Sequence, residues 1–386
     1  MKKVFVVADN IISPLGNSTA ENFKRLVQGV SGIQLQVEPE YWHEPFYASL
    51  FEKNNQFFIG DPGSHFTKFE KLLISSIGNS LEISGMDAKD PKTILIISST
   101  KGNIHLLETG EPFHDLPASG RKQLEERIAL PTSAQLVGDY FHFVHQPIVV
   151  SHACVSGLLG IIAAMRLLQS GQYEHAVVAG ADIISKFVLA GFQSFQAISD
   201  QPCRPFDANR NGLTLGEAAG TVILSSGLGN SPDSLEIAGG SVSNDANHIS
   251  GPSRTGKELY QAIQTAMKNA RVSAGEIDFI SAHGTATLYN DEMEAKAITL
   301  AKLQEVPMNS LKGYFGHTLG AAGLIESIVS MQSLKENLVL PTAGFSQPGT
   351  SEIVNVCSTL QSGHIKNCLK TASGFGGCNA ALVIRS

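Results

Sequence analysis

Long hydrophobic runs are missing from this sequence of 386 residues. The first apolar stretch, residues 4–7, follows two lysines but is too short for the hydrophobic region of a secretory signal peptide. No stretch approaches the roughly 18 consecutive apolar residues of a membrane-spanning helix. We therefore expect neither a signal peptide nor a membrane span, and we interpret residues 4–7 as the first strand of a globular fold.

Paired cysteines and clustered basic residues are also missing. The cysteines stand at positions 154, 203, 357, 368 and 378, an odd number with no Cys-x-x-Cys spacing. Such usage is typical of reduced thiols in the cytoplasm, and neither cysteine nor histidine spacing indicates a metal site. The formal net charge is −7 and basic residues form no run, which argues against nucleic acid as a partner. We expect a cytoplasmic protein that needs no metal and no other cofactor.

Short β-branched runs alternate with helix-like segments along most of the chain. The runs cover residues 4–7, 93–97, 148–151, 176–179, 221–224, 279–281 and 381–384. Apolar strands separated by helices are typical of α/β proteins whose sheets are covered on both faces. With 42% hydrophobic residues, the chain has enough apolar side chains for a large core of this kind.

The sequence also shows an internal similarity. The segment CVSGLLGIIAAMRLLQS, beginning at Cys154, aligns with HTLGAAGLIESIVSMQS, beginning at His317, and LGEAAGTVIL aligns with FGGCNAALVI in the same order. A duplicated α/β unit explains this, with halves over residues 1–235 and 236–386. The alternative is chance similarity between two apolar helices rich in small residues. Equivalent loops of such sheets lie at the carboxyl ends of strands, so a duplication predicts that Cys154 and His317 meet.

Cys154 stands between a strand-like segment and a helix-like one. A thiol at a helix N-terminus faces the positive end of the helix dipole, which lowers its pKa and favours the reactive thiolate. The unpaired N–H groups there can also stabilise a developing oxyanion. Since free cysteines are often inert core residues, the local sequence leaves a buried structural thiol open as the alternative.

Two histidines follow strand-like segments in the C-terminal half. His283 precedes Thr285 and Thr287, whose hydroxyls suit a polar substrate chain, and a surface-loop histidine is the alternative. His317 lies at a second strand-to-helix junction, where the helix dipole keeps an imidazole neutral and able to donate to a carbonyl that becomes negative. One thiol and two such imidazoles suit thioester chemistry.

A carboxylate-assisted hydrolase fits the sequence less well. No acidic residue shares the junctions that carry the cysteine and the two histidines. We interpret Asp291 and Glu294 as residues at the start of a helix, where the dipole favours negative charge.

With these motifs in view, the sequence resembles the β-ketoacyl-[acyl carrier protein] synthases of the elongating Cys-His-His type, which are thiolase-like condensing enzymes. The resemblance rests on VFVVADNIISPLGN, CVSG, CRPFDANRNGLTLGEAAG, SNDANHIS, AHGTAT, LKGYFGHTLGAAGLIES and SGFGGCNAAL, in this order. It implies a five-layer α-β-α-β-α fold and a homodimer. It also implies a 3-oxoacyl-[acyl carrier protein] synthase that works with acyl and malonyl carrier proteins.

The resemblance assigns roles to individual residues. Cys154 would carry the acyl group as a thioester, and His283 and His317 would hold the malonyl thioester carbonyl. The backbone N–H groups of Cys154 and Phe375 would form the oxyanion hole. The other implied roles are orientation of the histidines by Lys312 and Glu326, contact with the pantetheine arm by Thr285 and Thr287, and gating of the acyl pocket by Phe192 and Phe375. A structural monovalent cation is also compatible with the resemblance, but the sequence places no ligands for it.

Departures from the family pattern leave the pathway open. His152 and Cys378 each stand where the family usually has threonine, and the segments that shape the acyl pocket are altered. The alternatives are a synthase dedicated to a polyketide, polyene or pigment, possibly with a related chain-length subunit, a thiolase, and a non-catalytic chain-length partner. The presence of Cys154 argues against the last. We expect carrier docking to use basic residues such as Lys68, Lys71 or Arg204.

Overall fold

The computed structural model describes residues 2–37, 42–52, 65–109, 111–227 and 234–386. Its large sheet follows the order β11-β10-β14-β15-β9-β1-β8-β6-β4-β5. These strands are β1 (Phe5–Ile12), β4 (Thr93–Ser98), β5 (Ile148–Val150), β6 (His175–Asp182), β8 (Ala218–Ser225), β9 (Glu236–Asn244), β10 (Phe279–Ser281), β11 (Met308–Asn309), β14 (Asn367–Gly374) and β15 (Cys378–Arg385).

Smaller strands and the helices complete the fold. One small sheet contains β2 (Gln34–Gln36), β3 (Phe46–Ser49) and β7 (Leu215–Gly216), and another contains β12 (Leu338–Val339) and β13 (Gln361–Ser362). The α-helices are α1 (Thr19–Val27), α2 (Lys68–Ser84), α3 (Ala118–Ile128), α4 (Leu130–Tyr140), α5 (Ser156–Ser170), α6 (Lys186–Ser194), α7 (Lys257–Ala270), α8 (Leu288–Leu300), α9 (Lys312–Phe315) and α10 (Ala322–Glu336). Single 3₁₀ turns cover Ile104–Glu108, Ala274–Glu276 and Leu319–Ala321.

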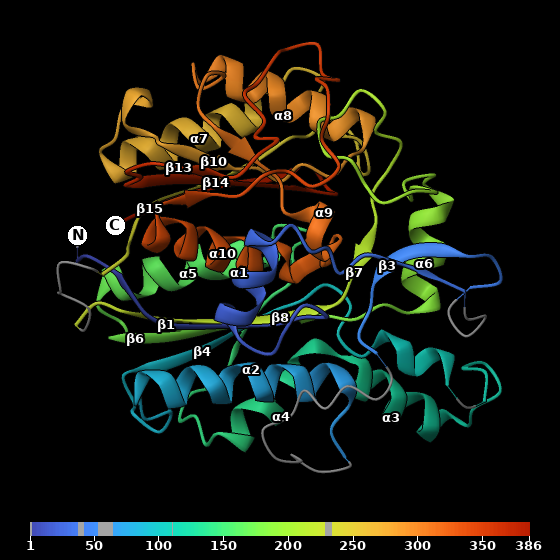
Figure 1. Ribbon diagram of the computed structural model, residues 1–386. Coiled ribbons are helices and arrows are strands. Elements are labelled where there is room, and N and C mark those ends of the chain that lie inside the picture. The colour runs from blue at the N-terminus through green and yellow to red at the C-terminus, as the bar shows by residue number, and fades with distance from the viewer. Residues whose placement is uncertain (1, 38–41, 53–64, 110, 228–233) are drawn as a thin grey trace.

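The large sheet consists of two stacked layers that join only where β1 meets β9. That junction is a single register pair, Phe5 with Glu236. Figure 1 shows α7 and α8 outside one layer, α1, α5 and α10 between the two layers, and α2 and α4 outside the other. The predicted five-layer α-β-α-β-α architecture is therefore confirmed. Each predicted strand is also present, with boundaries that differ by a few residues.

The two layers have matching topologies. In the layer β1-β8-β6-β4-β5, the first two pairs of neighbouring strands are antiparallel and the last two pairs are parallel. The layer β9-β15-β14-β10-β11 has the same pattern in the same order. This correspondence supports our proposal that the chain is a duplication with halves 1–235 and 236–386. The buried central helices α5 and α10 occupy equivalent positions in the two halves.

The middle layer contains a helix with unusual apolar character. Among the described residues, Ala153–Ser170 is long and apolar enough by length and composition to cross a membrane, with a mean hydropathy of 1.5. Small polar residues interrupt this segment, so it contains no long run of consecutive apolar residues. It is 61% buried and lies between the two sheets (Figure 1), so its composition is that of a core helix.

Helices α5 and α10 pack on each other at two glycines. A Cβ added at Gly157 would lie 2.7 Å from the backbone N of Leu324, and one added at Gly323 would lie 2.9 Å from that of Leu158. Neither backbone can retreat, because both helices are enclosed by sheets. The glycines therefore set the close approach of the two central helices.

We predict that Gly157→Ala and Gly323→Ala each lower the free energy of unfolding by about 1–3 kcal/mol, the usual cost of overpacking. The measurement is chemical denaturation followed by circular dichroism. Gly191→Ala is the matched control: this helical glycine has nothing within 4 Å of an added Cβ, so the change should be neutral or stabilising. Equal effects at the three positions would contradict the tight packing.

Candidate active site

The turn that carries Cys154 is strained and firmly held. Ala153 has a φ of 46°, in the left-handed region that residues with a Cβ rarely adopt. Ser156 Oγ accepts from the backbone N of His152 at 2.7 Å and donates to the carbonyl of Ala153 at 2.6 Å. On the other side, a Cβ added at Gly374 would lie 3.0 Å from the backbone N of Cys154. The structure thus confirms a sharp strand-to-helix turn, and Cys154 is only 8% exposed.

The predicted lowering of the Cys154 pKa was wrong for the free protein. Burial raises the pKa of this thiol to about 11, although the nearby charge of Lys312 opposes the shift. A helix terminus contributes about 1 kcal/mol, whereas removing an ionised group from water costs several kcal/mol, so burial outweighs the dipole. Cys154 is accordingly a neutral thiol at pH 7, and its proton must be removed when it reacts.

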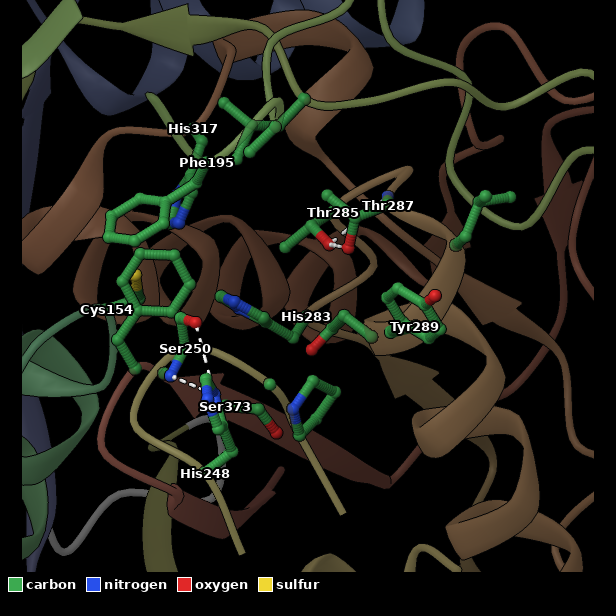
Figure 2. Close-up of a pocket in the computed structure, with 18 of the residues that line it drawn as sticks. Cys154, Phe195, His248, Ser250, His283, Thr285, Thr287, Tyr289, His317 and Ser373 are labelled. Carbon is green, nitrogen blue, oxygen red and sulfur yellow. Dashed lines mark hydrogen bonds between the residues drawn. The ribbon is translucent and has the colours of Figure 1, made fainter. Parts of the chain in front are cut away.

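Cys154 meets His283 and His317, as Figure 2 shows. The sulfur and one ring nitrogen of each histidine all lie within 4.8 Å of one another. The two imidazole rings are 5.3 Å apart at their centroids and nearly perpendicular, at 81°. The prediction that Cys154 and His317 come together is confirmed. These atom types also bind zinc, but an ion there would occupy the sulfur and exclude its use as a nucleophile.

Both histidines are neutral at pH 7. Burial and the neighbouring Lys312 ammonium hold the pKa of each well below its usual value. Lys312 Nζ lies 3.2 Å from Nδ1 of His283 and 2.5 Å from the carbonyl oxygen of the same residue. An ammonium group has only donors, so Nδ1 of His283 accepts and its Nε2 carries the hydrogen. His283 is therefore a hydrogen-bond donor through Nε2.

A chain of buried charges lies beneath the histidines. Lys312 Nζ is 2.7 Å from one oxygen of Glu326, and Lys370 Nζ is 2.8 Å from the other. All three side chains are nearly inaccessible to solvent. Lys312 and Glu326 were predicted from the sequence, whereas Lys370 was not, because a lone lysine in an apolar strand shows no recognisable spacing.

The interpretation of Asp291 and Glu294 as ordinary helix-start residues was incomplete. Both carboxylates are fully buried and bind the backbone of the loop that carries His283. Glu294 accepts from the N–H groups of His283 and Gly284, each at 2.8 Å, and Asp291 accepts from that of Thr285 at 2.8 Å. Acidic residues therefore do share this junction, where they fix the loop. Their i, i+3 spacing on one face of α8 was the available signal.

The three side chains open into a cavity of about 460 Å³. Thr285 and Thr287 line it, with their hydroxyl oxygens 2.8 Å apart (Figure 2). Phe192, Phe195 and Phe375 line another part, where Phe375 is stacked on Phe192 and meets the edge of Phe195. The predicted binding residues thus share one cavity with the thiol and the imidazoles. Lys312 and Glu326 lie behind it.

His152 and Cys378, the two residues that stand where the family usually has threonine, contact each other. Nε2 of His152 and Sγ of Cys378 form a short polar contact that joins the segment before Cys154 to the start of β15. Separately, Lys68 pairs with the buried carboxylate of Glu217 at 2.7 Å. Of the docking candidates, Arg204 is exposed.

Family models match most of the sequence. Residues 1–228 match the "Beta-ketoacyl synthase, N-terminal domain" and residues 235–346 match the "Beta-ketoacyl synthase, C-terminal domain". The chain belongs to the beta-ketoacyl synthase family. The predicted family and the predicted class of enzyme, an acyltransferase of the condensing type, are therefore confirmed.

Individual relatives come from two kinds of biosynthesis. A 3-oxoacyl-[acyl-carrier-protein] synthase 2 of Vibrio cholerae is 28% identical over 100% of this chain and 99% of its own. A relative from Streptomyces cyaneus named "Putative polyketide beta-ketoacyl synthase 1" is 32% identical over 72% of this chain and 69% of its own. Among solved structures, the ishigamide ketosynthase/chain length factor has a TM-score of 0.86 at 23% identity, with 100% and 99% of the two chains covered. This last likeness confirms the fold alone.

The raised pKa of Cys154 predicts a distinctive alkylation profile. Because its thiolate fraction increases tenfold with each pH unit below about 11, iodoacetamide should modify Cys154 about tenfold faster per unit between pH 7 and 9. Peptide mass analysis measures the rate at this residue, with N-acetylcysteine as the control for the reagent. A rate that is flat across this range would show a thiolate already formed in the free protein.

Proposed function

We propose that this chain is a 3-oxoacyl-[acyl carrier protein] synthase that joins an acyl group on Cys154 to the two-carbon unit of a malonyl carrier thioester. The observation that supports this best is the convergence of one thiol and two neutral imidazoles at a single cavity. Thiol, imidazole and thioester chemistry suit one another because a cysteine thioester remains activated toward carbon nucleophiles.

In the first half-reaction, Cys154 sulfur attacks the thioester of an acyl carrier. The thiol proton leaves with the pantetheine sulfur, and a neutral imidazole within 4.8 Å of the sulfur can pass it on. The tetrahedral oxyanion would bind the backbone N–H groups of Cys154 and Phe375. The close contact between Gly374 and the Cys154 backbone supports this pairing.

In the second half-reaction, malonyl thioester loses carbon dioxide. His283 and His317 donate hydrogen bonds to the thioester oxygen, which becomes negative as the carbon–carbon bond to carbon dioxide breaks. The resulting carbanion attacks the acyl carbonyl on Cys154, and the sulfur leaves and takes up a proton. Lys312, held by Glu326, keeps Nδ1 of His283 as an acceptor so that Nε2 donates.

The cavity walls suit the two parts of the substrate. The hydroxyls of Thr285 and Thr287 can contact the polar pantetheine arm, while Phe192 and Phe375 border an apolar space for the acyl chain. An acidic carrier protein needs a basic surface near the entrance, and exposed Arg204 is a candidate for it. The five free cysteines support a reducing cytoplasm as the location.

A second candidate is a ketosynthase for a polyketide, polyene or pigment. The polyketide synthase among the relatives and the ketosynthase/chain length factor among the solved structures favour it. In the described part of the chain, β5 pairs only with β4, which leaves its outer edge for a second chain. We place the dimer contact there, with a second copy for the first function or a related chain-length subunit for the second.

Cys154→Ala should abolish covalent loading. The protein is incubated separately with acyl carriers that differ in acyl chain length. Intact-mass analysis should then show one acyl adduct on the unchanged protein and none on the variant. Cys378→Ala, the matched control, should load normally because its thiol lies outside the cavity lining. An adduct that persists in Cys154→Ala would overturn the assignment. The range of chain lengths accepted distinguishes the two candidate functions.

Lys312→Ala should separate loading from condensation. Cys154 should still be acylated, whereas the formation of 3-oxoacyl carrier should fall by about 100-fold or more because His283 loses the group that fixes its tautomer. Product analysis by mass spectrometry measures both steps. Lys89→Ala, at an exposed lysine, is the control and should condense normally. Normal condensation in Lys312→Ala would remove this residue from the mechanism.

A further inference from the structure

Lys370 lies in β14 with its ammonium group completely buried. Nζ donates to three backbone carbonyl oxygens: Ser281 at 3.0 Å, Ala282 at 3.1 Å and Thr371 at 2.8 Å. A fourth oxygen, one of the Glu326 carboxylate, lies 2.8 Å away. The ammonium is thus surrounded by oxygen atoms from three separate segments of the chain.

The composition of this shell is that of a monovalent cation site. The three ammonium protons are used by the three carbonyls, and the fourth oxygen is held by charge, since Oε2 of Glu326 makes no hydrogen bond of good geometry. Backbone carbonyl oxygens are the ligands that replace water around potassium ions. An ammonium ion has a similar size and the same charge.

The shell also determines the position of the reacting groups. Two of its carbonyls belong to Ser281 and Ala282, which directly precede His283. Its carboxylate, on Glu326, holds Lys312 through the other oxygen, and Lys312 in turn contacts His283. A positive charge at this point therefore holds both the backbone and the side-chain partner of His283.

We propose that Lys370 is a tethered cation: its ammonium fills an oxygen cage that would otherwise need a monovalent ion, and thereby positions Glu326, Lys312 and His283 without a bound ion. Lys370 is a positioning residue, because it lies behind the cavity and does not line it. An ordinary buried ion pair would also tie β14 to Glu326, but it would create no site that a free ion could fill.

The first arm of the test uses the unchanged protein. Its thermal unfolding midpoint and its condensation rate should be the same in potassium, sodium, ammonium and tetramethylammonium chloride at equal ionic strength. A specific requirement of the unchanged protein for potassium or ammonium would overturn the proposal, because the cage would then need a free ion.

The second arm compares two variants at position 370. Lys370→Ala leaves the cage open, so in tetramethylammonium chloride its unfolding midpoint should fall by about 5 °C or more and its condensation rate by about tenfold. Potassium or ammonium should restore both with a saturable dependence. Lys370→Met fills the cage with an uncharged chain, so both properties should stay low in every salt.

Controls separate this proposal from the proposed function. Lys335→Ala removes a half-exposed lysine that pairs with Asp9 at 3.4 Å, and it should gain no cation dependence. Cys154→Ala should lack condensation yet unfold as the unchanged protein does in every salt, so the unfolding readout does not depend on catalysis.

Two results would contradict the tethered cation. One is a Lys370→Met variant that matches the unchanged protein, since the charge would then be unnecessary. The other is a Lys370→Ala variant that no ion restores. Should Lys370→Ala not fold without potassium, its refolding yield with and without potassium chloride becomes the measurement, and equal yields would count against the proposal.

Discussion

The close packing of α5 on α10 is the constraint on which the site depends. Gly157 and Gly323 let the two backbones approach, and this brings together the turns that precede the helices, one with Cys154 and the other with His317. Cys154 follows β5 of one layer, whereas His317 follows β11 of the other layer with the short helix α9 between them, so neither layer alone can assemble the site. A larger side chain at the helix contact would separate the sulfur from the imidazole as well as loosen the core.

Much of the fold and of the candidate site could be predicted from the sequence, because the sequence patterns that indicate them are local or repeated. The β-branched runs marked the strands, and the similarity around Cys154 and His317 placed two residues together that are 163 positions apart. The electrostatic properties of the site could be predicted less well from the sequence. The thiol pKa was predicted in the wrong direction because a helix terminus can be seen in sequence, whereas the burial that outweighs it depends on the surrounding elements. Lys370 was missed because three of its four oxygen partners are backbone carbonyls, which carry no sequence signal.

The hairpin after β14 links the aromatic part of the cavity to the backbone of Cys154. Gly374 contacts the backbone of Cys154, and the next residue, Phe375, stacks on Phe192 at a ring distance of 5.9 Å. Gly376 and Gly377 both have positive φ, which gives this turn a backbone path that other residues rarely adopt. Under the proposed function, a movement of Phe375 that admits an acyl chain would also move its N–H, so entry of the chain and stabilisation of the oxyanion would not be independent.

The site keeps neutral and charged groups in separate layers. The groups that face the cavity, one thiol and two imidazoles, are uncharged because burial disfavours their ionised forms. The charged groups lie behind them, where Glu326 is shared by Lys312 and Lys370. The buried Glu294 carboxylate, which accepts from the backbone of His283 and Gly284, also lies here, so the two ammonium groups are balanced by two carboxylates. The ammonium of Lys312 adds to burial in disfavouring protonation of the two imidazoles in the resting protein. Under the proposed function, it would also favour negative charge on a carbonyl oxygen that the imidazoles bind.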